Sequence, residues 1–112
     1  MAIRQVQLIA PILLTGAAAA VLTAPSNTTY RIGRAGFSNP TANAIPVTAY
    51  LVPPAGSPGA GNEIVDAIVV PAGSTYVSPE LAGLVIQAGW SLEAFAGTAS
   101  AIVLYASGVS IQ

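Results

Sequence analysis

Proline and glycine divide this sequence into short pieces. The chain has eleven glycines and nine prolines in 112 residues, and they recur at intervals that would interrupt a long helix. The stretch 52–76, VPPAGSPGAGNEIVDAIVVPAGSTY, is typical, because two turns rich in proline and glycine enclose one apolar run. A chain divided in this way favours short strands joined by turns.

The pieces between the turns alternate with a period of two, which is the pattern of a strand with two different faces. About eight strands are predicted, in or near residues 3–14, 17–25, 30–39, 45–52, 63–71, 71–81, 91–96 and 101–111. This number and spacing predict a single all-β domain over residues 1–112, an antiparallel β-sandwich of jelly-roll or Ig-like type.

Two of these pieces allow a more detailed prediction. In 63–71 the charged Asp66 shares a register with Ile64 and Ile68, so the inward face is predicted to be Val65, Ala67 and Val69. Residues 53–62 contain three prolines and three glycines. They cannot hold a regular ladder and are predicted to form an exposed loop.

Charge is scarce. Charged residues make up 6% of the chain and hydrophobic residues 54%, with a net charge of −1, three arginines and no lysine, whereas globular domains average about 25% charged. A surface so poor in charge indicates that copies of the chain or a partner cover it, and we expect a homo-oligomer. The alternative is a monomer with a Ser/Thr/Asn surface. Three arginines cannot build the basic patch that nucleic acid requires.

No charged residue occurs between Gln5 and Tyr30. The segment LIAPILLTGAAAAVL resembles the apolar region of a signal peptide, but Gln5 and Gln7 alternate with Val6 and Leu8, as in a strand with one polar face. The apolar run is also shorter than the about 20 residues that a membrane span needs. We therefore predict that residues 1–14 form an N-terminal strand or assembly arm that can pair with a neighbour, and no membrane partner.

The chain has no histidine and no cysteine, which removes the commonest general base, soft metal sites and thiolate nucleophiles. Its four acids are Glu63, Asp66, Glu80 and Glu93. Glu63 and Asp66 are three residues apart on a predicted strand and are expected to point to opposite faces. We predict no enzymatic activity, no cofactor and no metal site.

Trp90 follows a turn, where it serves either as a contact anchor or as a lid on the core, and Tyr76 is ambiguous in the same way. The candidate interface residues combine these aromatics with the apolar residues of the N-terminal strand. They are Ile3, Val6, Leu8, Ile12, Leu14, Trp90 and Tyr76.

The turn spacing and strands of residues 30–111 resemble a group of small virion proteins of tailed bacteriophages. The similarity lies in a strand ending in YLVP, a Gly/Ala/Ser loop, a turn at PAGST, the segment PELAGLVI and a last strand that ends after SG. Trp90 departs from this pattern, in which the AG turn continues with a polar residue, and so does the alanine-rich segment TGAAAAVLTAPSNTT.

The resemblance implies a non-enzymatic virion protein, assembled in the bacterial host cytoplasm. As a capsid cement or decoration subunit it would bind the major capsid protein or other virion proteins. A neck, collar or tail-fibre component is the alternative of the same class. A receptor- or carbohydrate-binding module that uses Trp90, Tyr76 and Glu93 is the alternative of another class. An exposed Trp90 ring would favour that module.

Overall fold

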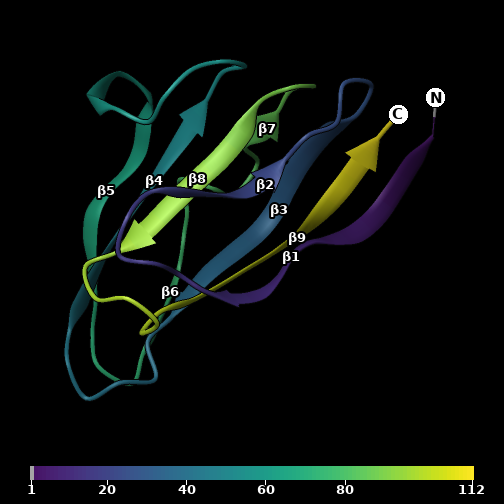
Figure 1. The fold of residues 1–112 in the computed structure, drawn as a ribbon. Coiled ribbons are helices and arrows are strands. Elements are labelled where there is room, and N and C mark those ends of the chain that lie inside the picture. Colours follow the sequence, from purple (N-terminus) through teal and green to yellow (C-terminus); the bar gives the residue numbers. More distant parts are fainter. Residues whose placement is uncertain (1) are drawn as a thin grey trace.

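The computed structural model describes residues 2–112, so Met1 of the predicted segment 1–14 lies outside the described residues. Within them the chain forms nine strands and one 3-10 turn (Figure 1). The elements are β1 (Ile3–Leu13), β2 (Ala19–Thr23), β3 (Thr29–Ser38), β4 (Ile45–Val52), η1 (Ala60–Asn62), β5 (Glu63–Val70), β6 (Thr75–Val77), β7 (Val85–Ile86), β8 (Ser91–Ala96) and β9 (Val103–Ile111).

The strands form two antiparallel sheets. Sheet I has the order β1-β9-β3-β6, with β7 also pairing with β3, and sheet II has the order β2-β8-β4-β5. The first strand pairs with the last, and the chain passes repeatedly from one sheet to the other. This order is that of a jelly roll, in which two Greek keys build a double sheet. The predicted antiparallel β-sandwich is confirmed, in its jelly-roll form.

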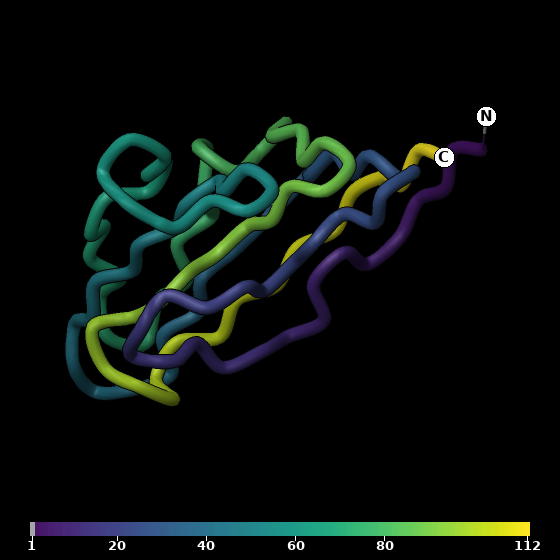
Figure 2. Tube along the Cα trace, turned by 45° about the horizontal axis from the view of Figure 1, so that its top comes forward, coloured from purple at the N-terminus to yellow at the C-terminus, as the bar shows by residue number. Residues whose placement is uncertain are grey.

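The sandwich is elongated, with extents of 45 × 27 × 20 Å. Figure 2 shows β1 and β9 running side by side along its length, with the two ends of the chain together at one corner. At that corner Ala2 and Gln112 exchange two backbone hydrogen bonds, of 2.9 and 2.8 Å. The two ends of the described chain are therefore bonded to each other in line with the β1–β9 ladder.

Alternating residues of the two sheets meet in one core. On the inner face of sheet I, Ile32, Phe37 and Leu104 are fully buried, and Val47 and Leu92 are fully buried on the inner face of sheet II. Small residues fill the positions between them, namely Ala35, Ala49, Ala94, Ala96 and Ala106. Burial of these alternating side chains is what selects the register of each strand.

The predicted inward face of β5 is partly wrong. Val65 is buried, but Ala67 is exposed, Val69 is 56% exposed and Val70 is fully buried. The cause is a β-bulge, because Ala49 pairs with Val65 and Val47 pairs with Ile68, so β5 has one more residue than β4 between these pairs. Ala67 takes a φ of +47° in the bulge. The extra residue reverses the alternation after Val65.

Two further segments complete the comparison with the sequence. The two-residue strand β7 was not predicted, and it pairs with Tyr30 and Arg31 of β3. In the predicted loop 53–62, the residues from Pro54 to Gly61 are exposed, and η1 closes the loop where the Asn62 side chain donates to the Ser57 carbonyl at 2.9 Å.

Candidate interaction surfaces

Strand β1 lies at the edge of sheet I. Its ladder partner is β9, and no second strand of residues 2–112 pairs with its other side. Ala2 and Gln112 form a hydrogen-bonded pair. In an antiparallel ladder such pairs alternate with pairs that do not exchange hydrogen bonds. The backbone N–H and C=O groups of Ile3, Gln5 and Gln7 therefore point away from β9, toward the open edge.

The second half of β1 is less suited to pairing. Register shifts interrupt the ladder between Gln7 and Ile9 and again between Ile9 and Ile12, and Pro11 lacks an N–H. Irregularities of this kind are how proteins protect an edge strand. The regular open ladder is thus confined to the part of β1 from Ile3 to Gln7.

The interface residues predicted in the N-terminal segment 3–14 fall into three groups. Ile3 is 61% exposed and Ile12 is 44% exposed, while Val6 and Leu8 are half-buried. Leu14 is different, because it is only 2% exposed and its N–H donates to the Ile102 carbonyl at 2.8 Å. Leu14 is a core residue, and its side chain is buried within the chain's own sandwich.

Sequence reasoning missed four other exposed apolar side chains. They are Leu13, Val69, Val77 and Val85, each between 44% and 56% exposed. Val77 and Val85 lie on the short strands β6 and β7. Their exposure depends on how these strands pair with β3, which alternation in the sequence does not show.

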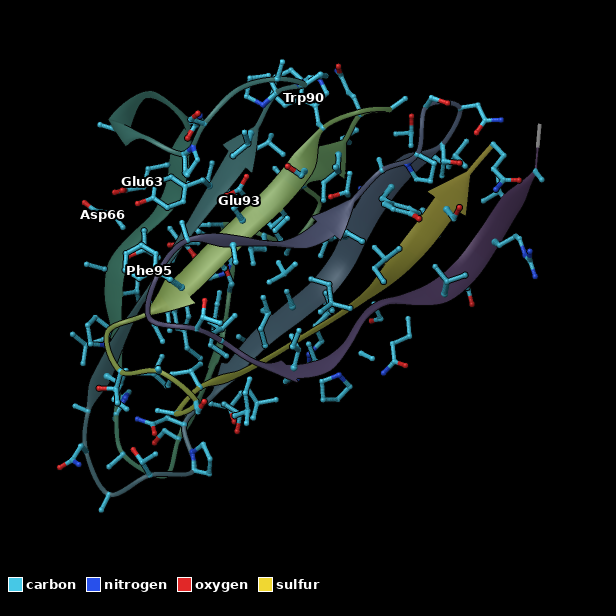
Figure 3. All side chains as sticks on the ribbon, viewed as in Figure 1. Glu63, Asp66, Trp90, Glu93 and Phe95 are labelled. Atoms are coloured by element: carbon cyan, nitrogen blue, oxygen red, sulfur yellow. The ribbon has the colours of Figure 1, made fainter. Side chains whose placement is uncertain are left out.

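Trp90 is half-buried and packs against the core cluster. It follows Gly89, whose φ of +85° turns the chain into β8. Trp90 borders a depression of about 460 Å³, which Leu51, Pro53 and Ile64 also line. Figure 3 shows the ring at the end of the sandwich, near the turn before β8. Trp90 thus combines a packing role with partial exposure.

Tyr76 is also half-buried, and its ring lies 6.4 Å from that of Phe37. Its hydroxyl donates a hydrogen bond of 2.6 Å to the Glu80 carboxylate, which also accepts one of 3.0 Å from Ser78. Burial and the hydrogen bond with Glu80 raise the pKa of Tyr76 to about 12. These contacts give Tyr76 a structural role at the edge of sheet I.

The carboxylates of Glu63 and Asp66 lie on the same face, contrary to the expectation from their spacing. Tyr50 pairs with Glu63 while Ala49 pairs with Val65, so β5 has an extra residue here as well. This extra residue reverses the alternation between positions 63 and 66 and brings both side chains to one face. A hydrogen bond with Asp66, partial desolvation and the charge of Asp66 raise the pKa of Glu63, whereas a hydrogen bond from Tyr50 lowers it.

The outer face of sheet II therefore carries an acidic and aromatic surface. Glu63 and Asp66 of β5 project from the margin of the sheet, and Glu93 and Phe95 of β8 lie beyond them on the same face (Figure 3). The rings of Tyr50 and Phe95 stack with centroids 6.3 Å apart. Desolvation and the neighbouring Glu63 raise the pKa of Tyr50.

In residues 2–112 no group of three or more acidic, histidine or cysteine side chains is placed to hold a metal ion. The described chain also contains no helix of the length and apolarity required for a membrane crossing. The described residues present several surfaces for contact: the β1 edge, the end of the sandwich at Trp90, and the outer faces of the two sheets.

The fold and these surfaces define a jelly-roll β-sandwich protein. No protein-family model and no curated protein matches its sequence. Among solved structures, it is similar to a chain in the structure of infectious bursal disease virus Gx strain, with a TM-score of 0.51 and 15% identity over 97% of this chain and 31% of the viral chain.

Two further structures give lower scores. A chain of the Gt strain of the same virus matches with a TM-score of 0.49 and 14% identity over 97% of this chain and 32% of that one. A chain of the infectious bursal disease virus VP2 subviral particle matches with a TM-score of 0.46 and 16% identity, over 97% of this chain and 31% of that one. This chain spans about a third of the viral chains. At this identity, the match with the Gx strain shows a shared fold.

Proposed function

We propose that this protein is a non-enzymatic structural protein of a virion. The likeness of its fold to a chain of infectious bursal disease virus supports the general class. The turn pattern of residues 30–111, which resembles virion proteins of tailed bacteriophages, supports the narrower form of the proposal: a cement or decoration subunit, itself oligomeric, that binds the major capsid protein.

The observation that carries the proposal is the open edge of β1. Ile3, Gln5 and Gln7 offer backbone donors and acceptors that β9 does not use, and Ile3 adds an exposed apolar side chain beside them. A strand from a neighbouring subunit can bond to such an edge through main-chain groups alone. Binding of this kind requires no charge, which suits a chain with 6% charged residues.

A neck, collar or tail-fibre component would use the same edge, and the number of copies in the particle distinguishes it from a cement subunit. The carbohydrate-binding alternative depends on an open Trp90 ring. Because that ring packs against the core, the structure favours assembly over sugar binding.

The test combines copy number with a backbone variant. Gln5→Pro removes an N–H that points away from β9, so the sheet keeps its own ladder while the edge loses a donor. Gln5→Thr is the matched control, because it loses the same side chain and keeps the N–H. Deleting residues 1–14 would be a poor test, since Ile9 and Leu14 belong to the core.

Quantitative mass spectrometry of purified particles gives the result. We expect native protein in an amount comparable with the major capsid protein, the Gln5→Thr variant at a similar level, and the Gln5→Pro variant about tenfold lower, which corresponds to about 1.4 kcal/mol of contact free energy. A few copies per particle would replace the cement role by a neck or tail role. Absence of the native protein would overturn the virion proposal. Gln5→Pro at the native level would exclude the β1 edge.

A further inference from the structure

The few charges of this chain are divided between the two sheets. All three arginines lie on sheet I, Arg4 on β1 and Arg31 and Arg34 on β3, and all are exposed. Three of the four acids lie on sheet II: Glu63, Asp66 and Glu93. The fourth, Glu80, is bonded to Tyr76 and Ser78.

Bulges place the paired charges on the outward faces. Arg31 and Arg34 are three residues apart, a spacing that would point them to opposite sides of a regular strand. The register shifts between Ile32 and Arg34, so that both arginines are exposed while Ile32 and Ala35 are buried. The register shift of β5 between Glu63 and Val65 does the same for Glu63 and Asp66. Each sheet thus carries one pair of like charges on its outer face.

The two faces also differ in shape. Beside Arg34, the outer face of sheet I has a depression of about 610 Å³, bordered by the polar side chains of Gln5, Gln7 and Ser107. Arg31 borders a smaller adjoining depression of about 160 Å³. On sheet II, Glu63 and Asp66 project from the margin at β5 (Figure 3), next to the bulge at Ala67. A basic face with a shallow depression and a projecting acidic margin (Figure 3) are complementary.

We propose that copies of this chain pack head to tail, with Glu63 and Asp66 of one copy seated over the two adjoining depressions beside Arg34 and Arg31 of the next. This contact joins neighbouring copies within the assembly proposed above, and the inference therefore rests on the proposed virion function. In a surface with so few charges, two opposite pairs fix the register of the contact. Because the two surfaces lie on the outer faces of opposite sheets, one copy cannot present both to the same neighbour. The contact is therefore heterologous and generates a ring or a filament rather than a two-fold dimer.

Charge reversal tests the contact in the purified protein. Arg34→Glu and Asp66→Arg should each weaken self-association about tenfold or more, because like charges would then face each other. An equimolar mixture of the two variants should assemble, since each junction again joins opposite charges. The double variant should assemble by itself for the same reason. Arg4→Glu is the matched control, as it changes the net charge by the same amount as Arg34→Glu.

Sedimentation velocity and native mass spectrometry, at low and high salt, measure the association. Circular dichroism verifies the fold, and the neutral variants Arg34→Gln and Asp66→Asn replace any reversed variant that fails to fold.

A native protein that stays monomeric would overturn the proposal. Single variants that associate like the native protein would also overturn it, as would a mixture of the two variants that does not assemble. So would an Arg4→Glu variant that weakens association as strongly as Arg34→Glu does. A monomer present in particles at high copy number would refute the self-contact alone. Salt-sensitive assembly of a protein absent from particles would refute the virion role alone.

Discussion

The side-chain hydroxyl of Thr48 accepts a hydrogen bond of 3.2 Å from the backbone N–H of Ala67. Ala67 is the bulged residue of β5 with a φ of +47°, and a bulged residue loses its place in the ladder. Thr48 is 6% exposed and lies on the neighbouring strand β4. The side chain of one strand thus provides the acceptor that the bulge of the other has lost.

Thr48→Val should destabilise the protein by about 1 kcal/mol, the usual net contribution of such a hydrogen bond. Valine keeps the shape of threonine and loses the acceptor. The free energy of unfolding in denaturant, followed by circular dichroism, measures the effect. Thr48→Ser retains the hydroxyl and should lose less. A Thr48→Val protein as stable as the native one would show that the bulge does not need this bond.

Gly108→Ala should be strongly destabilising. A Cβ at Gly108 would lie 2.9 Å from the backbone nitrogen of Gly33 and 3.0 Å from the carbonyl carbon of Arg31. Both neighbours are backbone atoms of β3, which can make room only if β3 and β9 separate. We expect a loss of about 3 kcal/mol, at the upper end of overpacking effects.

Gly59→Ala is the control for that variant, because nothing lies within 4 Å of a Cβ at this position and its φ of −170° is ordinary extended backbone. Its effect should stay within about 0.5 kcal/mol. Thermal unfolding of the two variants beside the native protein measures the difference. Equal stability of the two variants would contradict the close approach of β3 and β9.

Asn39→Asp should make stability depend on pH. The Asn39 side chain is 1% exposed, and its amide nitrogen donates to the carbonyls of Asn43 and Val70 at 2.7 and 2.9 Å. A carboxylate there would face two carbonyl oxygens, so its pKa would rise in the folded state and its ionisation would cost about 3 kcal/mol at neutral pH.

The sign of this dependence follows from the raised pKa. The Asn39→Asp protein should be most stable at acid pH, relative to the native protein, and should lose stability as pH rises through the raised value. Asn43→Asp is the control, because Asn43 is exposed and contributes backbone groups to the cluster. Parallel pH–stability curves for the native and Asn39→Asp proteins would refute the prediction.

Asp66→Asn should lower the pKa of Glu63 toward its ordinary value. The hydrogen bond with Asp66 is the largest cause of the raised pKa of Glu63, and the charge of Asp66 adds to it. A carboxyl group with a raised pKa lowers stability as pH rises through that pKa. The substitution should therefore stabilise the protein at neutral pH and have no such effect in strong acid.

Carbon-13 NMR titration of the Glu63 carboxyl group provides the measurement. Glu93→Gln is the control, because Glu93 lies on β8 and does not contribute to the pKa of Glu63. A Glu63 pKa that is the same in the native and Asp66→Asn proteins would show that the two carboxyl groups do not interact.

Regular alternation in the sequence was sufficient to predict the strands that are regular in the structure. The predicted segments 45–52 and 91–96 coincide with β4 and β8, because one face of each strand meets the core along most of its length. The strand β7 has only two residues, too few to show a period. Leu14 could not be assigned from the pattern either, since its burial depends on the path of the chain after β1.

The bulges account for the surfaces that the sequence did not predict. One extra residue reverses the side-chain parity of all positions that follow it, and no residue type marks the bulge at Ala67, where glycine would be the usual signal of a positive φ. The shared faces of Glu63 and Asp66, and of Arg31 and Arg34, follow from such residues. The order of strands in each sheet, which distinguishes a jelly roll from an Ig-like sandwich, depends on pairings between strands distant in sequence.

The two hydrogen bonds between Ala2 and Gln112 bring entry and exit of the domain to one point. A domain with this geometry can be inserted into a surface loop of another protein without stretching either connection. By the same geometry, its ends can be joined by a short linker and new ends opened within the exposed residues 54–61. The β-sandwich would then carry its β1–β9 ladder as a continuous hairpin, so that the strand with the open edge is tied covalently to its ladder partner at the corner where the ends now meet.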